Sequence, residues 1–371
     1  MSDLGSLSRK LGMYLGAAAG IALLAGAQPV QAQTAYEKLV AASKAEVDKL
    51  GGTIKMALDW PDEDAKPVLT EFMKTYNFVK KIDFERETGI DPFGRYLISF
   101  KQPGVTAPYD VMHIASEYEQ QYLEAGLFTK PPFDYKEVAA SLPKDWPALN
   151  AANLDPNGYF VSTTANTRGI IYNPNVVRGN DVPKNWADCL DPKWKGKVMI
   201  DARNKMQAFQ YDQKQRPIFM KWFDDLYKNG VVLGRGQAQL VEKVGSGEFP
   251  IACGVNYHTT YRAIENDGVK TIRFVMPDPI PLEFATRLFV LKNSRPPATT
   301  ELFGIWAVTA GQEAIGKYAW RGMPWNPKAH NYEASKGKAV VLCDAECALK
   351  FEDFEKEYQQ AFKIPVAGGN R

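Results

Sequence analysis

The densest group of polar side chains in the chain stands at residues 256–261, which read Asn-Tyr-His-Thr-Thr-Tyr. It follows an apolar run at 249–253 and opens a segment with helical spacing, so a strand is expected to lead into a helix there. The first turn of a helix has backbone N–H groups without partners, which favour an anion. Tyr257, His258 and Thr259 add a phenol, an imidazole and a hydroxyl that plain packing would not require. We therefore predict that these three residues bind a ligand.

A second junction of this kind, at residues 59–64, supplies carboxylates and an aromatic ring. Asp59 and Trp60 follow a strand expected at 53–58, and a large aromatic ring at a strand exit is more often a contact or lobe-edge residue than core. Asp62 begins the next helix, where the helix dipole alone favours acidic residues. Both interpretations stay open for Asp62. We treat Asp59, Trp60 and Asp62 as candidate binding residues.

Two further junctions complete the set. His113 and Ser116 follow a strand expected at 109–114, although Ser116 could simply cap the next helix and His113 could be an ordinary strand residue. Arg203 follows a strand expected at 198–200, and its guanidinium can grip a carboxylate or a phosphate through two donors. A surface ion pair is the alternative role for Arg203. We include His113, Ser116 and Arg203 among the candidate binding residues.

The elements that must hold these junctions alternate along the chain. The spacing of apolar residues predicts a helix over 36–50, then a strand over 53–58, and later a helix over 217–226. The alternation of strands and helices indicates α/β lobes with mostly parallel sheets. In such lobes a ligand lies outside the carboxyl ends of the strands, which is where all four junctions stand.

The length of 371 residues suggests two domains, at about 100 to 200 residues for each. The segment 168–200 has the features of a crossing between them. Its apolar run 170–172 stops at Asn173-Pro174, where proline removes a backbone donor and forces an extended or turning chain. A second proline-rich passage, at 277–281, is expected to bring the chain back.

Three stretches around the first crossing resemble a known family: Ile-Ile-Tyr-Asn at 170–173, Pro-Lys-Asn-Trp-Ala-Asp at 183–188, and Asp-Pro-Lys-Trp-Lys-Gly-Lys-Val at 191–198. They are similar to the signature of the periplasmic solute-binding proteins of ABC importers (extracellular solute-binding family 1), in the branch that includes the ferric-ion-binding proteins. The resemblance implies a two-lobe periplasmic binding protein fold of type II, with two hinge crossings. The bounds expected are 1–32 for a signal peptide, 33–165 for the first part of lobe 1, 166–278 for lobe 2, and 279–371 for the second part of lobe 1.

The same resemblance implies a function. The protein would capture a small organic anion, or a complex of an anion with a metal, and deliver it as a monomer to an inner-membrane permease and its ATPase. No resident cofactor is expected. Ferric-binding members carry two adjacent tyrosines as phenolate ligands; here Tyr257 matches the first, and His258 stands at the second position. Iron binding through Tyr257 with a bound anion is one alternative. Binding of an amine or polyamine by the acidic-aromatic loop around Trp60 is another.

The N-terminal segment predicts export. Arg9-Lys10 precedes an apolar run at 11–26 and a small-residue cleavage site that ends at Ala32. The apolar run is shorter than the roughly 20 residues that a membrane-spanning helix needs. We expect cleavage after Ala32 and a periplasmic protein. The net charge of +2 gives no reason to expect a nucleic-acid partner.

An enzyme would be the rival class. The sequence has no Gly-x-Ser-x-Gly, no His-Glu-x-x-His and no phosphate-binding glycine loop, and its histidines are scattered at 113, 258 and 330. We therefore predict no enzymatic activity. A solute-loaded protein that docks on a sensor would have the same fold, so sequence does not separate it from an importer component.

The four cysteines would be exposed to an oxidising compartment after export. On a regular helix Cys343 and Cys347 would hold their β-carbons about 5 to 6 Å apart, wider than a disulfide tolerates. A bond between them therefore requires a turn at 344–346 and a helix that starts after it. We favour this local pair, with Cys189 and Cys253 either free or paired with each other.

Overall fold

The computed structural model describes residues 33–87, 91–102, 107–115, 118–203 and 206–364. The described residues from Thr34 onward form one compact unit. The predicted signal peptide at 1–32 and the candidate Ser116 lie outside the described residues. Among the described helices, none is both long enough and apolar enough to cross a membrane.

The described strands form one mixed sheet. Its main path runs β2 (Lys81–Arg86), β1 (Thr53–Leu58), β3 (Val111–Ala115), β10 (Ile280–Leu291), β5 (Phe160–Tyr172), β8 (Ile251–Asn256), β6 (Val198–Asp201) and β7 (Val232–Gly234). Beside this path, β11 (Val340–Cys343) and β4 (Phe128–Thr129) pair with β10, and β9 (Arg273–Val275) pairs with β5.

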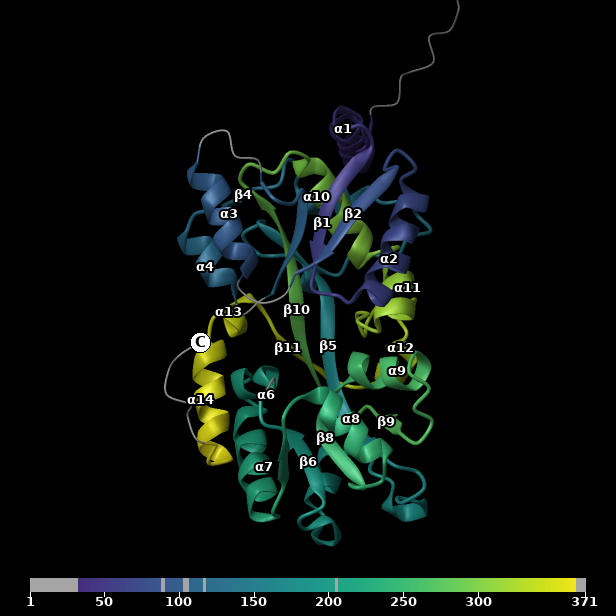
Figure 1. Cartoon of the computed structure of the whole chain (residues 1–371), viewed down its shortest axis with the longest axis vertical. Helices are drawn as coiled ribbons and strands as arrows, with labels where there is room; N and C mark the ends of the chain where they lie inside the picture. Colours follow the sequence, from purple (N-terminus) through teal and green to yellow (C-terminus); the bar gives the residue numbers. More distant parts are fainter. Residues whose placement is uncertain (1–32, 88–90, 103–106, 116–117, 204–205, 365–371) are drawn as a thin grey trace, which may run out of the picture. The chain divides into compact units, whose positions relative to one another are not determined.

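The two ends of this sheet are parallel, and its middle is antiparallel. β1 pairs in parallel with β2 and β3, and β6 pairs in parallel with β7 and β8. Between these two strand groups, β5 and β10 run antiparallel to each other and extend from one group toward the other (Figure 1). The predicted α/β class is confirmed, and β5 and β10 are the strands that cross. The bounds of the lobes within the chain stay a prediction.

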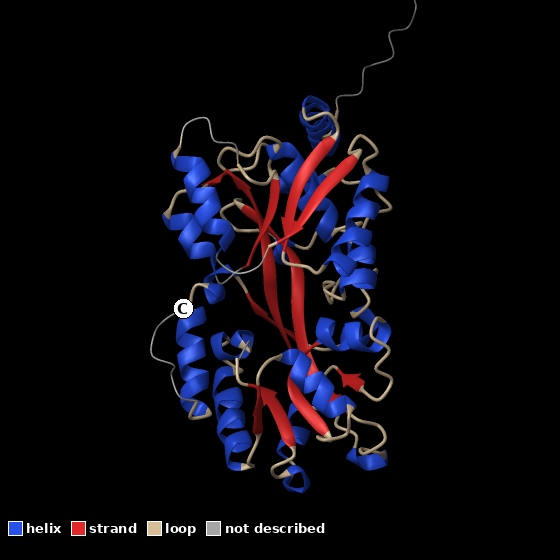
Figure 2. Cartoon of the chain, viewed as in Figure 1, coloured by secondary structure: helices blue, strands red, loops and turns tan. Residues whose placement is uncertain are grey.

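Helices lie outside the strands on both sides (Figure 2). The α-helices are α1 (Ala35–Lys49), α2 (Asp62–Thr75), α3 (Asp91–Lys101), α4 (Glu119–Glu124), α5 (Tyr135–Ala140), α6 (Gln207–Tyr211), α7 (Arg216–Lys228), α8 (Gln237–Gly245), α9 (Tyr257–Glu265), α10 (Pro297–Val308), α11 (Gln312–Ala314), α12 (Tyr332–Ser335), α13 (Ala345–Ala348) and α14 (Phe351–Ala361). Turns of 3₁₀-helix are η2 (Ala151–Asn153), η3 (Gly179–Asp181), η4 (Trp186–Leu190) and η5 (Pro192–Trp194), and η6 (Ile315–Ala319) is a turn of π-helix.

Local sequence explains where several of these helices begin and end. Thr34 accepts a hydrogen bond from the backbone of Glu37, whose carboxylate bonds back to Thr34, so a capping box starts α1. α7 carries a proline in its first turn, where the missing N–H costs nothing. α7 ends at Asn229-Gly230, and Gly230 takes the left-handed φ of 73° that a side chain would disfavour.

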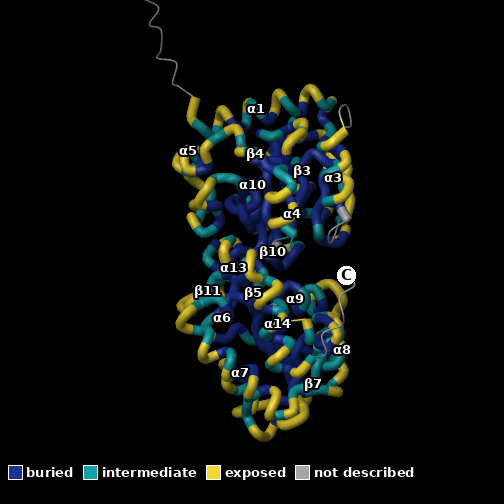
Figure 3. Tube along the Cα trace, turned by 90° about the vertical axis from the view of Figure 1, so that its left-hand side faces the viewer, coloured by how far each residue is buried: buried dark blue, intermediate teal, exposed yellow. Residues whose placement is uncertain are grey.

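Two large apolar clusters hold the strand groups. In the first, Phe72 of α2 meets Phe303 and Trp306 of α10 edge to face, with ring centroids 5.1 and 5.2 Å apart. In the second, Phe223 of α7 packs against Tyr358 of α14 and the following Phe362. The last described helix, α14, thus covers α7. β5 and β10 are themselves buried along most of their length (Figure 3).

All four cysteines form disulfides. The favoured local pair, Cys343 with Cys347, is confirmed, with Cα atoms 5.1 Å apart. Cys343 ends β11, and the Asp344 side chain accepts a hydrogen bond from the backbone N–H of Cys347 at 3.0 Å, which caps α13. The helix begins at Ala345, earlier than predicted, because this cap already forms the required turn. The second pair, Cys189 with Cys253, joins η4 to β8.

The two disulfides should stabilise the fold unequally. Cys189 and Cys253 are 64 positions apart, whereas Cys343 and Cys347 are 4 apart. Loop-closure entropy then predicts that double replacement by alanine lowers the free energy of unfolding by roughly 4 kcal/mol for the first pair and roughly 2 kcal/mol for the second. Urea denaturation of the two double variants measures the difference. Equal losses, or the reverse order, would contradict this account.

Candidate functional site

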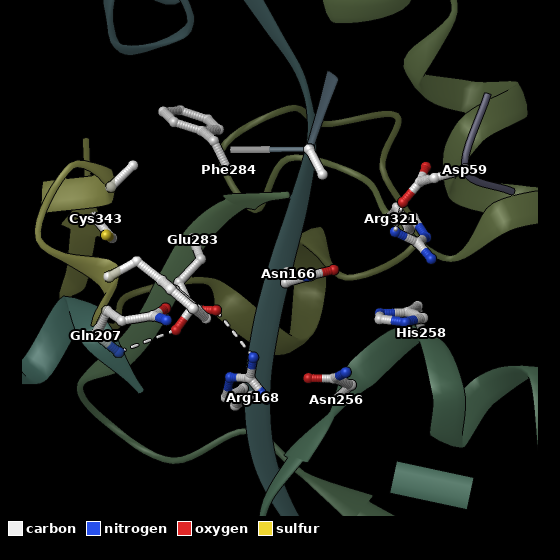
Figure 4. A pocket seen from close by; sticks show the side chains of 13 residues that line it. Asp59, Asn166, Arg168, Gln207, Asn256, His258, Glu283, Phe284, Arg321 and Cys343 are labelled. Carbon is white, nitrogen blue, oxygen red and sulfur yellow. Dashed lines mark hydrogen bonds and ion pairs between the residues drawn. The ribbon is translucent and has the colours of Figure 1, made fainter. Parts of the chain in front are cut away.

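A cavity of about 220 Å³ lies where β5 and β10 cross between the two strand groups (Figure 4). Three residues of its wall stand at the carboxyl ends of strands, since Asp59 follows β1, Ala115 ends β3 and Asn256 ends β8. That is where an α/β lobe offers its ligand site. Other polar residues of the wall are Asn166, Arg168, Gln207, His258, Glu283 and Arg321.

A buried ion pair forms one side of the cavity. A guanidinium Nη2 of Arg168 lies 2.9 Å from Oε2 of Glu283, and the two side chains are 2% and 9% exposed. The other carboxylate oxygen of Glu283 accepts the backbone N–H of Gln207 at 3.1 Å. The pair therefore joins β5, β10 and the start of α6, and both charges have a partner as burial demands.

A second pair, on the opposite side in Figure 4, is looser. Nη1 of Arg321 lies 3.6 Å from Oδ2 of Asp59, and the side chains are 10% and 25% exposed. Arg321 follows Trp320, whose φ of 57° is left-handed and turns the chain after η6. At this distance the contact is Coulombic, because it is longer than a hydrogen bond.

His258, near Arg321 in Figure 4, is buried. Burial lowers its pKa well below the usual range, and the charges of Arg321, Arg262 and Arg168 lower it further. The imidazole is therefore neutral at neutral pH. Its Nδ1 is buried without a hydrogen-bond partner among the described residues.

Several other buried polar atoms of the cavity wall also lack a hydrogen-bond partner among the described residues. Within the described chain, Nε of Arg168, Nε of Arg321 and the amide oxygens of Asn166 and Asn256 have no hydrogen-bond partner. Buried polar atoms in folded proteins are normally paired. Their gathering at one cavity, with both donors and acceptors present, is the arrangement that a polar solute would complete.

Tyr257 and Trp60 pack in the interior, and neither lines the cavity. The Tyr257 hydroxyl forms a hydrogen bond with Nδ1 of His330, and burial raises the pKa of the phenol. Trp60 is fully buried in the first apolar cluster, with its ring edge-on to His113 at a centroid distance of 5.3 Å. Both side chains hold elements that support the cavity wall.

The remaining candidates occupy different surroundings. His113 is buried beside the cavity, and its Nε2 lies 3.1 Å from the Thr163 hydroxyl. Asp62 is exposed and pairs with Lys66 at 2.6 Å, and Arg203 is 70% exposed and lies 3.6 Å from Asp201. Thr259 is half-buried in α9. Of the sequence-based candidates, the structure brings Asp59 and His258 to the cavity.

Sequence reasoning missed the two arginines and Glu283. A signal existed for one pair, since Arg168 is the one charged residue of the apolar stretch 160–172, and Glu283 is one of two charged residues in the apolar stretch 280–291. A charge inside a buried strand needs a partner, and each of these is the other's partner. Arg321 had no such signal, because it stands in a segment between helices.

Two strand groups joined by two crossing strands, with a polar cavity at the crossing, define a two-lobe protein that encloses a small solute. The model of the family described as bacterial extracellular solute-binding protein matches residues 105–340, more than half of the chain. The chain belongs to this family. It is the substrate-binding protein of an ABC transporter, periplasmic, with a small-molecule solute and a permease as partners.

Solved structures agree on the fold. Iron-bound HitA from Pseudomonas aeruginosa is 19% identical with a TM-score of 0.59, over 82% of this chain and 99% of that one. The Trichodesmium protein IdiA (FutA), in complex with iron and citrate, is 15% identical with a TM-score of 0.62, over 83% and 99%. Mannheimia haemolytica ferric iron-binding protein A, in an open conformation, is 16% identical with a TM-score of 0.63, over 83% and 98%. The fold is the type II periplasmic binding fold, as predicted.

His113 should make the fold sensitive to acid. Burial lowers the pKa of His113 to about 3, with a smaller contribution from Arg321, whereas the unfolded chain titrates near 6.5. Below pH 6.5 the His113 imidazole takes up a proton in the unfolded state and stays neutral in the folded state. The free energy of unfolding therefore decreases as the pH falls. Between about pH 7 and about pH 5 the loss is roughly 2 kcal/mol.

The comparison of wild type with His113→Gln isolates this group from the carboxylates. Urea denaturation at both pH values should show that the variant loses roughly 2 kcal/mol less on acidification than the wild type. Equal losses in the two proteins would mean that His113 titrates normally.

Proposed function

We propose that this protein captures a small organic acid in the cavity beside Arg168 and Arg321 and presents it to the permease. One observation supports this choice above the others: Nε of each arginine is buried at the same cavity without a partner among the described residues. A guanidinium offers its N–H donors in a planar fork that matches a carboxylate, a phosphonate or a phosphate.

Arg321 is the better candidate for the primary contact. Arg168 is bound to Glu283 at 2.9 Å, whereas the contact of Arg321 with Asp59 is 3.6 Å long, so Arg321 can turn its donors to a solute. Neutral His258 beside it supplies one donor and one acceptor without adding charge. The cavity of about 220 Å³ lies below the roughly 300 to 1,000 Å³ of pockets for drug-sized ligands, which suits a small metabolite.

The second candidate cargo is a complex of such an acid with a ferric ion. Two structural neighbours are named as iron-bound, one of them with citrate. Tyr257 is a poor ligand for a ferric ion, because burial raises the pKa of its phenol and its hydroxyl is hydrogen-bonded to His330. Among the described residues no group of three or more His, Cys, Asp or Glu side chains could hold a metal ion. A ferric ion would therefore bind in the cavity as its complex with the organic acid.

The amine alternative has less support in this arrangement. It relied on Trp60 as an aromatic plate and on Asp62 as a second carboxylate. Trp60 is fully buried in the apolar cluster, and Asp62 pairs with Lys66 at the surface. Of that loop, Asp59 is the residue that lines the cavity.

Export of the protein and its transport partners are part of the same proposal. We propose that residues 1–32 are a signal peptide cleaved after Ala32, and that the mature protein works as a monomer with a permease and its ATPase. We propose no reaction on the solute. Docking on a sensor is the remaining alternative, and neighbouring genes for a permease and an ATPase, as opposed to a histidine kinase, would discriminate between the two roles.

The test is a thermal-shift screen of the mature protein against carboxylates, phosphonates, phosphate esters, polyamines and ferric citrate. Calorimetry on the best binder then compares Arg321→Gln with Arg203→Gln, a matched change at an arginine that is 70% exposed. Arg321→Gln should weaken binding by about 1.5 to 3 kcal/mol, the usual worth of a hydrogen bond to a charged group. Arg203→Gln should leave the affinity unchanged.

A loss in Arg203→Gln with none in Arg321→Gln would move the site from the cavity to the start of α6. A polyamine as the sole hit would replace the acid with an amine.

A further inference from the structure

Arg321 follows a residue with an uncommon backbone conformation. Trp320 ends η6 with φ of 57° and ψ of 20°, in the left-handed region. Helices often end in this conformation, but the residue is usually glycine and sometimes asparagine, because a β-carbon there comes too close to the following carbonyl oxygen. Trp320 is also 8% exposed, with its indole Nε1 buried without a hydrogen-bond partner among the described residues. Both features make tryptophan an unfavourable residue for this position.

The left-handed turn sets the direction in which the chain leaves η6. A further residue in helical conformation would continue η6 and carry Arg321 around the helix axis. The turn leads the chain to β5 instead, where the carbonyl oxygen of Arg321 accepts the backbone N–H of Ala165 at 3.2 Å. Ala165 precedes Asn166 of the cavity wall and stands next to the register shift in the β5–β10 ladder. The backbone of Arg321 is therefore fixed at the crossing strands, with its guanidinium at the cavity (Figure 4).

Two more hydrogen bonds hold the chain after the turn. The amide Nδ2 of Asn331 donates to the carbonyl oxygen of Gly322 at 2.9 Å. The backbone N–H of Met323 donates to the side-chain oxygen of Gln312 at 2.7 Å. Residues 321–323 thus have backbone partners in three separate segments, and the conformation of Trp320 decides whether the chain reaches them.

The indole ring of Trp320 fixes the turn from outside the cavity. It stacks on Tyr261 of α9 at a centroid distance of 5.9 Å and lies edge-on to His330 at 4.6 Å. η6 itself packs against α2, which belongs to the first strand group, whereas α9 follows β8 of the second. Trp320 therefore links the two strand groups, and Arg321 comes directly after this link.

We propose that Trp320 is a positioning residue of the solute site, whose left-handed backbone directs Arg321 to the cavity. The ring of Trp320 keeps this turn in place through Tyr261 and His330. The inference rests on the proposed function, because it takes Arg321 as the contact for the acid group. A guanidinium that is held in place before binding spares the solute the entropy of ordering it. A tryptophan that is unfavourable at a helix end then serves binding.

Arginine labelling tests the placement without any solute. Phenylglyoxal modifies accessible guanidinium groups, and peptide mass spectrometry gives the rate at each one. Arg321, whose side chain is 10% exposed, should react at least fivefold faster in Trp320→Ala than in the wild type, because that variant lacks the ring and disfavours the left-handed backbone. Trp320→Phe keeps an aromatic ring and should stay within twofold of the wild type. Arg203, which is 70% exposed, is the internal control and should react equally in all of them.

Lys363 offers a matched control for the backbone. It also has a left-handed φ, of 50°, and it follows α14. Lys363→Ala should leave the labelling rate of Arg321 unchanged. Thermal unfolding verifies that each variant is folded, and Trp320→Leu, which also lacks the aromatic contacts, takes the place of Trp320→Ala if the latter is not.

Calorimetry with succinate, citrate and methylphosphonate tests the effect on binding. For the acid that binds best, Trp320→Ala should weaken binding at least tenfold and Trp320→Phe less than threefold. In an Arg321→Gln background, Trp320→Ala should weaken binding by less than a further twofold, because a positioning residue acts through the residue that it positions. A general loosening of the fold would add its own loss in that background.

The outcomes separate the two proposals. Equal labelling of Arg321 in the wild type and Trp320→Ala, unchanged affinity in Trp320→Ala, or a further loss in the Arg321→Gln background overturns the role of Trp320 while the acid-binding function stands. If none of the three acids binds the wild type, or if Arg321→Gln binds them as the wild type does, the proposed function itself fails, and the inference fails with it.

Discussion

The buried ion pair between Arg168 and Glu283 is the interaction on which the site depends. Each charge would be costly to bury alone, and the 2.9 Å contact together with the backbone N–H of Gln207 offsets that cost. The pair ties β5 to β10 at the place where both strands pass between the strand groups. Removal of Glu283 would leave the buried guanidinium of Arg168 without this ion pair, which is costly in the protein interior.

Strand register also fixes the positions of other polar residues in the cavity wall. Asn166 and Arg168 are two residues apart on β5 and therefore point to the same face of the strand. Asn166 is opposite Glu283 in the ladder with β10, and Arg168 is opposite Asn256 in the ladder with β8. A shift of one residue in either ladder would turn these polar groups into the apolar clusters. Backbone pairing thus fixes one side of the cavity without any help from the solute.

The opposite side is held by contacts between segments far apart in sequence. Asp64 of α2, fully buried, forms an ion pair with Arg262 of α9, and Asp59 lies near Arg321. Burial raises the pKa of Asp64, and Arg262 opposes that rise. These links join the first strand group to α9 and to the segment after η6. Of the ion pairs that line the cavity, the one between Arg321 and Asp59 is longer and more exposed than the one between Arg168 and Glu283.

Sequence predicted what local pattern determines, such as the strand over 53–58 and the helix that ends at Asn229-Gly230. It also singled out Asp59 and His258, which line the cavity, because a strand exit and a helix start are visible in consecutive residues. It could not find Arg321, whose role depends on a contact with a residue far earlier in the chain. Trp60 is the opposite case, a residue that sequence proposed for the site and that the fold buries. Helices of the first apolar cluster cover its ring, and the sequence around Trp60 does not indicate that they do so. Burial is decided by which elements meet, and the pattern of one segment does not contain that information.

Buried polar atoms without partners lie at the cavity, apart from the two large apolar clusters. The two large clusters that hold the strand groups are built from apolar and aromatic side chains, where packing alone stabilises the fold. Buried donors and acceptors without partners cost free energy of folding, about 1 to 3 kcal/mol each, and several of them gather at the crossing among the residues that the structure describes. A solute that paired with these atoms would recover part of that cost on binding. The rigid ladder side and the closed Arg168–Glu283 pair keep these atoms in place, which spares the solute the entropy of ordering them.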